Sequence, residues 1–297
     1  MTKIVRILAL ILVALSPHLL FAQQDHLSKI ISLTKSFKGK VSISVLRMED
    51  NDTLSYNGNN YCIMDNVFKL PIAITLLNNI DKGKLSLNEK IFVSVKEITA
   101  DNWSPLRDKY PKGDIEISIE DLLSYMLVSS DNVAGDILLK RIGGPKKVED
   151  YMRSIGIKDM AMAASEVEIN GAWNIQYTNW CTPNAMVKLL AMLQKRKLLS
   201  NNSNTLLLKM MENSTTGSNR IKGLLPAGTV VAHRTGTSGI NKKGITTATN
   251  DIGIIHTPNG EHIILAVFIN DAEEDEKAID ALIAHITKEI FDDALKH

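Results

Sequence analysis

The segment Asn66-Val67-Phe68-Lys69 places an ammonium group one helical turn after a carboxamide, at the start of an apolar run. Residues three apart on a helix share a face, so the two side chains are expected on the same side. A nucleophile followed by a lysine that activates it would suit covalent catalysis in this arrangement. Asn66 cannot attack, because its carboxamide nitrogen is delocalised and non-basic and its oxygen is not a hydroxyl. Taken alone, the segment is better explained by a solvated lysine near a helix start, and a catalytic interpretation depends on the other blocks of the chain.

Asparagine at position 66 also has a structural interpretation. Its carboxamide can accept hydrogen bonds from the free N–H groups of a first helical turn, so Asn66 is expected as an N-cap. Its own backbone N–H is kept and can form half of an oxyanion hole. Cys62, one turn earlier, is a thiol, but nothing in the sequence places a base beside it. We expect Cys62 and Cys181 to be separate buried thiols, while a disulfide between them stays an alternative.

Three further blocks carry polar groups that suit chemistry at a carbonyl. Ser130-Asp131-Asn132 follows an apolar helical segment, Glu166-Val167-Glu168-Ile169-Asn170 has loop character, and Arg234-Thr235-Gly236-Thr237 lies on a predicted strand. Each block alone has an ordinary explanation as a turn, an exposed loop or a strand. Together they supply a hydroxyl, a carboxylate and a guanidinium, which are groups that proton transfer and anion binding require.

In this order, the four blocks resemble the motifs of the class A β-lactamases and their penicillin-binding relatives, which have the form S-x-x-K, S-D-N and K-T-G with a glutamate base. The first block here has the form N-x-x-K, so the resemblance implies that Asn66 occupies the position of the nucleophilic serine. It implies that Lys69 helps to activate the nucleophile and that Ser130 relays a proton to the lactam nitrogen. Glu166 would then activate the hydrolytic water. The resemblance covers essentially the whole mature chain.

The resemblance also implies a substrate-binding set around these catalytic positions. Its members are Asn132 for the substrate amide, Asn170 for the hydrolytic water, Arg234 and Thr235 for the substrate carboxylate, Gly236 for close backbone approach, the N–H of Thr237 for the oxyanion hole and Trp103 for an aromatic wall at the cleft entrance. Arginine replaces the usual lysine of the last motif, keeps its positive charge and can hold a carboxylate through two N–H groups. A surface or core aromatic is the alternative interpretation of Trp103.

The function implied by the resemblance is that of a class A β-lactamase-type protein, which binds β-lactams and, in its family, hydrolyses the lactam amide through a serine acyl-enzyme. Because Asn66 lacks a hydroxyl, we expect impaired hydrolysis and no acyl-enzyme. Two alternatives stay open: a non-catalytic binder of β-lactams or cell-wall peptides, and a transpeptidase or carboxypeptidase of the penicillin-binding type. Glu166 and Asn170 argue against the second, because a transpeptidase needs no dedicated deacylating base.

Composition excludes several other classes. The 297 residues carry a net charge of +1, and no basic stripe interleaved with aromatics indicates a nucleic-acid surface. The histidines show no paired metal-ligand spacing, and no glycine-rich phosphate loop occurs. We therefore expect a small-molecule β-lactam as the partner, with no metal, no cofactor and no nucleic acid, and a monomer.

The first 22 residues predict a secretory signal peptide. Lys3 and Arg6 form a positive region, residues 7–15 are apolar, and polar sequence begins after Ala22. The apolar part is too short to span a bilayer comfortably, and no cysteine follows closely enough to indicate a lipid anchor. We expect an exported, periplasmic protein without a stable membrane anchor, while a retained anchor is the alternative.

The elements that must position these residues follow a strand, helix, strand order. Strand patterns occur near both ends of the mature chain, at 41–46, 53–56, 229–235, 251–256 and 262–269. Between them apolar residues recur at helical spacing, and an amphipathic helix closes the chain. Pattern and composition alone give a mixed α+β fold.

The resemblance adds the arrangement of these elements. It implies one antiparallel sheet built from N- and C-terminal segments with flanking helices, plus an inserted all-helical lobe. After a signal peptide at 1–22, residues 23–65 and 209–297 would form the α/β lobe and residues 66–208 the helical lobe. A ligand cleft is expected between the lobes, where pockets commonly form.

Overall fold

The computed structural model describes residues 27–98 and 102–296, so the signal peptide predicted at 1–22 lies outside the described residues. A helix covers residues 27–34. The elements that follow are β1 (Lys40–Arg47), β2 (Thr53–Tyr56), β3 (Cys62–Ile63), the 3₁₀ turn η1 (Asp65–Phe68), α3 (Lys69–Asp81), β4 (Lys90–Val93), α4 (Val95–Ile98), α5 (Pro105–Lys109), β5 (Ile115–Ser118), α6 (Ile119–Val128), α7 (Asn132–Arg141), α8 (Pro145–Ser154), β6 (Met160–Ala161), α9 (Glu166–Gly171), η2 (Trp173–Thr178), β7 (Trp180–Cys181), α10 (Pro183–Gln194), α11 (Asn201–Glu212), β8 (Val231–Thr237), β9 (Thr246–His256), β10 (His262–Ala272) and α12 (Glu276–Ala294). No helix in these ranges is long and apolar enough to cross a membrane.

A five-stranded antiparallel sheet joins the two ends of the chain in the order β2-β1-β10-β9-β8. β1 pairs with β10 in a register that sets Val41 opposite Ile269, and β2 pairs with the other edge of β1. β9 and β10 form the predicted hairpin, with His256 opposite His262. The prediction of an α+β fold with a sheet built from N- and C-terminal segments is confirmed.

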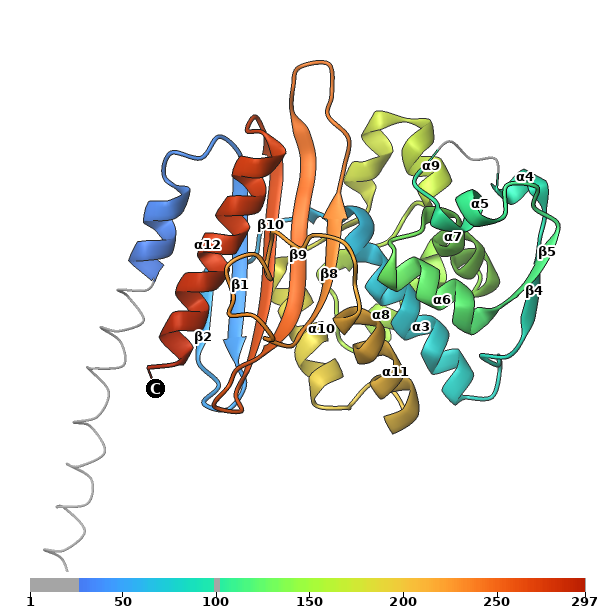
Figure 1. Ribbon diagram of the computed structural model, residues 1–297, viewed down its shortest axis with the longest axis horizontal. Helices are drawn as coiled ribbons and strands as arrows, with labels where there is room; N and C mark the ends of the chain where they lie inside the picture. The colour runs from blue at the N-terminus through green and yellow to red at the C-terminus, as the bar shows by residue number, and fades with distance from the viewer. Residues whose placement is uncertain (1–26, 99–101, 297) are drawn as a thin grey trace, which may run out of the picture.

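Both faces of the sheet are covered, because successive side chains of a strand point to opposite sides. On β10, Ile263 and Leu265 pack in one core with α12, whereas Ile264 and Phe268 pack in a second core with the central helices. Figure 1 shows α12 lying along one face of the sheet and the helices α3, α6 and α7 gathered beyond β8. β8 is therefore the edge strand that faces the helical region.

Helix α3 forms the centre of the helical region. Every residue from Lys69 to Leu77 is buried. A helix that is apolar on nearly all sides is expected inside a core, and α6, α7, α8 and α11 pack around it. The N-terminal end of α3 is thereby fixed close to β8, where η1 contacts both β8 and β9.

The inserted segment is not all-helical, which corrects the prediction for residues 66–208. β4 and β5 pair antiparallel, with Ile91 opposite Ile117, and the two-residue strands β6 and β7 join β3 in a small third sheet. Two residues are too few to leave a detectable periodicity, and β4 and β5 lack the short polar turn that joins β1 to β2. In addition, α10 packs on β1 and β10 and α11 packs on β8, so both helices lie against the sheet.

Candidate active site

The N-terminal end of α3 meets the edge strand β8 through η1. A Cβ atom on Gly236 would lie 2.7 Å from Met64 O and 3.2 Å from Asn66 N, so glycine permits the strand and the turn to approach this closely. Asn250 on β9 donates through Nδ2 to Met64 O at 3.0 Å and fixes the chain just before the turn. The position of Asn66 is therefore set by the sheet as well as by its own helix.

Asn66 lies inside η1 and not at its N-cap, which corrects the prediction. Met64 is the N-cap, and no side chain makes a capping hydrogen bond there. The carboxamide instead donates through Nδ2 to Asp65 Oδ1 at 3.0 Å. Asn66 Oδ1 is buried and has no hydrogen-bond partner among the described residues. The neighbouring carboxylate holds the amide nitrogen and leaves the carboxamide oxygen as an unpaired acceptor.

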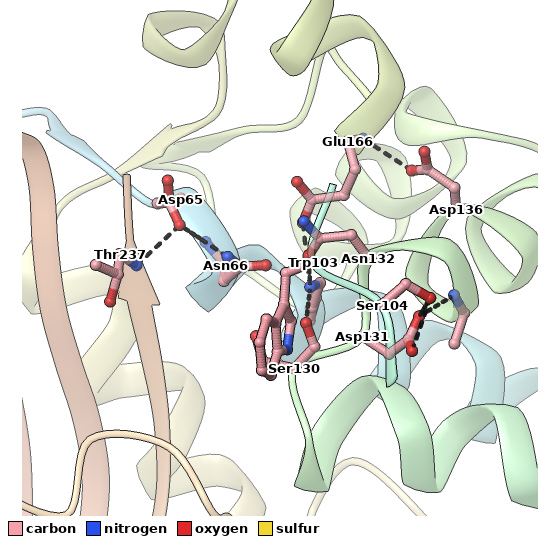
Figure 2. A network of polar contacts seen from close by, with 12 residues as sticks. Asp65, Asn66, Trp103, Ser104, Ser130, Asp131, Asn132, Asp136, Glu166 and Thr237 are labelled. Atoms are coloured by element: carbon pink, nitrogen blue, oxygen red, sulfur yellow. Dashed lines mark hydrogen bonds and ion pairs between the residues drawn. The ribbon is translucent and has the colours of Figure 1, made fainter. Parts of the chain in front are cut away.

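Asp65 adopts a left-handed backbone conformation with φ +46°. Its Oδ1 accepts hydrogen bonds from the backbone N–H of Asn66 at 2.6 Å and from the backbone N–H of Thr237 at 2.9 Å. Figure 2 shows Asp65 between Thr237 on β8 and Asn66 on η1. Burial raises the pKa of the Asp65 carboxyl, while the hydrogen bond from Asn66 and the charge of Lys69 act in the opposite direction. This carboxylate links the edge strand to the turn.

Lys69 is the centre of the polar cluster and has 0% exposure. Its Nζ donates to Ser130 O at 2.9 Å and to Asn132 Oδ1 at 2.5 Å, and it lies 3.2 Å from Glu166 Oε1. Burial lowers the pKa of Lys69 to about 8, against the opposing charge of Glu166. Burial likewise raises the pKa of Glu166 to about 7, against the opposing charge of Lys69. Burial thus shifts the pKa of each group toward neutrality, downward for Lys69 and upward for Glu166.

Glu166 is positioned by the first turn of α9. Ser165 caps this helix in a reciprocal capping box with Glu168, so Glu168 has a structural role. Asp136 on α7 accepts hydrogen bonds from the backbone N–H of Glu166 at 2.8 Å and of Val167 at 2.9 Å. Two carboxylates at the N-terminus of α9 thus satisfy backbone donors that would otherwise be unpaired, and they hold Glu166 against Lys69.

The Ser130-Asp131-Asn132 turn connects α6 to α7. Ser130 has φ +58°, and Asp131 caps α7 by accepting from Ala134 N at 2.8 Å. Asp131 is fully buried and also accepts from Leu106 N at 2.6 Å, so the expected structural role of Asp131 agrees with its contacts. This fixed turn presents the backbone carbonyl of Ser130 and the side-chain oxygen of Asn132 to Lys69.

Arg234 is fully buried, and its guanidinium is engaged by the protein. Nε donates to Asn66 O at 3.1 Å, one terminal nitrogen donates to Leu127 O at 3.1 Å, and the other donates to Ser130 Oγ at 2.5 Å. Burial lowers the pKa of Arg234 to about 10, so the group stays charged at neutral pH. Its position differs from the open two-pronged grip that the sequence suggested, since it bridges η1, α6 and the Ser130 turn.

The hydroxyl groups of Thr235 and Thr237 on β8 bond to residues outside η1. Thr235 is buried and shares a 2.6 Å hydrogen bond with the hydroxyl of Thr216. Thr237 is exposed, and its hydroxyl accepts from Arg220 at 2.8 Å. Arg220 also pairs with Asp280 at 2.7 Å, so this second buried arginine stands directly behind β8.

Two predicted residues lie at the rim. Trp103 is 61% exposed, and its Nε1 donates to Ser129 O at 2.9 Å beside the Ser130 turn. Figure 2 shows Trp103 beside Ser130, and its exposure excludes a core aromatic, while both a wall at the cleft entrance and a surface aromatic fit this position. Asn170 lies near the end of α9 and is exposed.

Sequence reasoning missed three residues that shape this site: Asp65, Asp136 and Arg220. A signal existed for Asp136, which follows Asn132 by one helical turn on α7 and so faces the same cluster. A signal also existed for Asp65, an acid adjacent to the nucleophile position. Nothing in the local sequence marks Arg220. Within the described ranges, no three His, Cys, Asp or Glu side chains gather as metal ligands. The absence of a metal and of a cofactor stays a prediction.

Known proteins match this chain over nearly its whole length. A family model described as "Beta-lactamase enzyme family" matches residues 24–294. The chain is 40% identical to β-lactamase VEB-1 of Pseudomonas aeruginosa, over 96% of this chain and 97% of that protein. It is 38% identical to the extended-spectrum β-lactamase PER-1 of the same organism, over 90% of this chain and 87% of that protein.

Solved structures agree with these relatives. The TLA-3 extended-spectrum β-lactamase superposes with a TM-score of 0.91 at 42% identity, covering 92% of this chain and 99% of that one. A class A β-lactamase from Bacteroides cellulosilyticus superposes with a TM-score of 0.89 at 35% identity, covering 93% and 99%. The motif order, the geometry around Lys69 and these matches lead to one conclusion. This chain belongs to the class A β-lactamase family.

Proposed function

We propose that this protein binds β-lactams in the cleft between η1, α9 and β8, and that it hydrolyses them poorly because Asn66 stands at the nucleophile position. The observation that carries the proposal is the buried cluster of Lys69, Glu166, Ser130 and Asn132 one helical turn after Asn66. This cluster supplies the base and the proton path for lactam hydrolysis. The relatives VEB-1 and PER-1 are named as β-lactamases, which supports the same substrate class.

The catalytic roles follow from the chemistry of the cluster. Glu166, with a pKa raised to about 7, is suited to take a proton from a water near neutral pH. Lys69 would tune that base and would have activated a serine at position 66. The hydroxyl of Ser130 would pass a proton to the lactam nitrogen as the ring opens. Arg234 supports this step, because it donates to Ser130 Oγ and so polarises the hydroxyl.

Substrate binding would use groups on both sides of the cleft. The proposed set is Asn132 and Asn170 from the helical side, Arg234, Thr235, Gly236 and the N–H of Thr237 from β8, and Trp103 at the entrance. The N–H donors of Arg234 already bond to protein acceptors. Its positive charge would therefore attract the substrate carboxylate by long-range electrostatics more than by direct hydrogen bonds.

The missing hydroxyl has a large expected effect. Removing the serine nucleophile of a protease with a comparable covalent mechanism lowers turnover by about 10⁶. About 10³ to 10⁴ of catalysis over water can persist through an oxyanion hole and binding alone. A water directed by Glu166 onto a bound lactam is the route that remains to this chain, and it would be slow.

Two other functions use the same cleft. A non-catalytic binder of β-lactams or cell-wall peptides would need only the binding set, and the lack of an attacking hydroxyl at Asn66 favours it. A transpeptidase or carboxypeptidase would not need a deacylating base. The capped α9 helix, which Asp136 holds so that Glu166 faces Lys69, argues for a water-activating base and against that function.

The setting of the protein is also part of the proposal. The positive, apolar and polar regions of residues 1–22 support export to the periplasm, where β-lactams act on the cell wall. We propose a monomer without a stable membrane anchor, which needs neither metal nor cofactor.

Intact-mass measurement with a penicillin and a chromogenic cephalosporin tests this proposal. Ring opening by a nucleophile adds the whole lactam to the protein, so an adduct has the combined mass of both. The unchanged chain should give no adduct and only slow turnover. Asn66→Ser should give an adduct on the new serine after prolonged incubation. Rapid turnover or an adduct on the unchanged chain would contradict the impaired function, and a serine variant that never acylates would contradict the assignment of the site.

A further inference from the structure

Asp65 Oδ1 occupies the meeting point of two backbone donors. It accepts from the N–H of Asn66 at 2.6 Å and from the N–H of Thr237 at 2.9 Å. These are the two donors that the proposed mechanism assigns to the carbonyl oxygen of a lactam. Asn66 Nδ2 adds a third hydrogen bond to the same oxygen at 3.0 Å. An oxygen of this chain therefore lies where the substrate oxygen would have to bind, as Figure 2 shows for the Thr237–Asp65–Asn66 side of the cleft.

We propose that the carboxylate of Asp65 fills the oxyanion hole from within and competes with the carbonyl oxygen of a lactam. The inference rests on the proposed function, because it takes the lactam as the ligand of the cleft. It adds an obstacle to hydrolysis that is separate from the missing hydroxyl of Asn66. A lactam can polarise its carbonyl in this site only after the Asp65 side chain has left it.

Charge and tethering both favour the internal carboxylate. Hydrogen bonds to an ionised acceptor are roughly twice as strong as those to a neutral one, and the carbonyl of an intact lactam is neutral. Asp65 is part of the chain, so it loses no translational freedom when it binds. Its negative charge also repels a carbonyl oxygen or a carboxylate that approaches the same donors.

The backbone aims Asp65 at the hole. Its φ of +46° lies in the left-handed region, which asparagine and aspartate tolerate better than most other side chains. Asn250 holds Met64 just before it, and Gly236 lets β8 approach to the distance at which Thr237 N reaches the carboxylate. Asp65 is partly exposed as a residue, so rotation about its side-chain bonds can vacate the hole while the turn stays folded.

Asp65 and Asn66 act as one unit in this arrangement. The amide nitrogen of Asn66 faces Asp65 Oδ1, because the amide oxygen in that place would meet a second acceptor. A serine at position 66 would remove the Nδ2 donor but would leave both backbone donors in place. Asp65 would therefore keep its position, and restoring the nucleophile alone would not restore a working oxyanion hole.

Equilibrium binding of benzylpenicillin is the first test, because a chain without a nucleophile allows a dissociation constant to be measured by calorimetry. Asp65→Gly empties the hole and accepts the positive φ, whereas Asp65→Asn also accepts it but keeps a neutral oxygen available. Asp114→Gly is the matched control, since Asp114 has φ +52° and also accepts from a backbone N–H, that of Val95. We expect Asp65→Gly to bind about tenfold more tightly or better, Asp65→Asn to fall between it and the unchanged chain, and Asp114→Gly to match the unchanged chain. Equal or weaker binding by Asp65→Gly, or the same gain in Asp114→Gly, would overturn the proposal.

Turnover of a chromogenic cephalosporin separates this inference from the proposed function. Loss of one oxyanion donor lowers turnover by about 10² to 10³, so the pair Asp65→Gly with Asn66→Ser should exceed Asn66→Ser alone by at least about 100-fold in kcat/KM. If Asn66→Ser alone is as fast as the pair, the role of Asp65 is refuted while the proposed function stands. If neither variant acylates, the proposed function fails. The NMR signal of the Thr237 amide then tests by itself whether Asp65 fills the hole.

The Thr237 amide reports on Asp65 without any ligand. In ¹⁵N-labelled protein, Asp65→Gly should move its proton resonance upfield and speed its exchange with solvent, because the carboxylate acceptor is lost. Asp114→Gly should leave that resonance in place. An unchanged Thr237 amide in Asp65→Gly would overturn the claim that Asp65 fills the hole.

Discussion

Replacing Glu166 with glutamine should stabilise the fold above neutral pH, although it deletes one member of a buried ion pair. Glu166 is 5% exposed, and its Oε1 lies 3.2 Å from Lys69 Nζ without forming an aligned hydrogen bond. Burial raises the pKa of this carboxyl from 4.5 to about 7, even though the charge of Lys69 opposes the shift. The ionised form of Glu166 is therefore less stable in the folded protein than in the unfolded chain, where water solvates it.

The sign of the pH dependence follows from proton binding. Between pH 4.5 and about 7 the folded protein holds the Glu166 proton more often than the unfolded chain does. The free energy of unfolding therefore falls as pH rises through this window. The pKa of Lys69 is lowered to about 8 by burial, so above that pH the folded state holds fewer protons and stability rises again with pH.

The magnitude comes from the width of the window. Near pH 4 the protonated carboxyl and a glutamine are alike, so both proteins should have similar stability. Each pKa unit corresponds to about 1.4 kcal/mol, so Glu166→Gln should be more stable than the unchanged chain by at most about 3 kcal/mol at pH 8. Lys69 keeps its acceptors on Ser130 and Asn132 in the variant but loses the favourable charge of Glu166, so the gain in stability should fall below this limit.

Urea unfolding at pH 4.5 and pH 8 measures this difference. Glu168→Gln is the matched control, because hydrogen bonds from the backbone and hydroxyl of Ser165 lower the pKa of Glu168. A lowered pKa contributes stability above the unfolded value, so the control should be destabilised at pH 8 and unaffected at low pH. The reasoning is refuted if Glu166→Gln is no more stable than the unchanged chain at pH 8, or if the gap does not widen with pH.

Three further predictions concern the frame of the site. Asp136→Ala removes the acceptor of two N–H groups at the start of α9, of which that of Val167 is exposed, and should lower the free energy of unfolding by about 1–3 kcal/mol, with limited proteolysis showing cleavage near α9. Gly236→Ala places a Cβ 2.7 Å from Met64 O, so it should lower the melting temperature and weaken penicillin binding, and retained binding would contradict the close packing of β8 on η1. Cys62 and Cys181 are free and buried, and burial raises the pKa of Cys62 to about 11. A thiol reagent should label neither in the native protein and two per chain in denaturant, whereas no labelling in denaturant would indicate a disulfide.

Sequence patterns predict the elements of this fold better than its contacts. The hairpin between β9 and β10 follows from a Pro-Asn-Gly turn between two apolar runs, and α12 follows from helical spacing of its isoleucines. The pair β6–β7 escaped prediction because strands of two residues carry no periodicity, and the pair β4–β5 because two helices separate these strands where β1 and β2 are joined by a short polar turn.

The site shows the same division. Motif order predicts that Lys69, Ser130 and Glu166 meet, and they do. The position of Asp65 depends on Thr237, a residue 172 positions away in the sequence, and no local pattern encodes that hydrogen bond. The orientation of Arg234 likewise depends on carbonyl groups from two distant helix ends. Contacts between segments far apart in the sequence therefore determine both the position of Asp65 and the orientation of Arg234.

Joining β1 to β10 has a consequence for how the molecule acquires its shape. Lys40 and Asp271 are 231 residues apart in the chain, yet Nζ and Oδ2 lie 2.7 Å from each other. Such high contact order slows folding, because the loop-closure entropy must be lost before the paired strands stabilise anything. Thr237 also belongs to this late-synthesised portion, so a nascent polypeptide that stops short of β8 would have neither the edge strand nor the Thr237 amide that bonds to Asp65. The site can therefore form only after nearly the entire chain has left the ribosome.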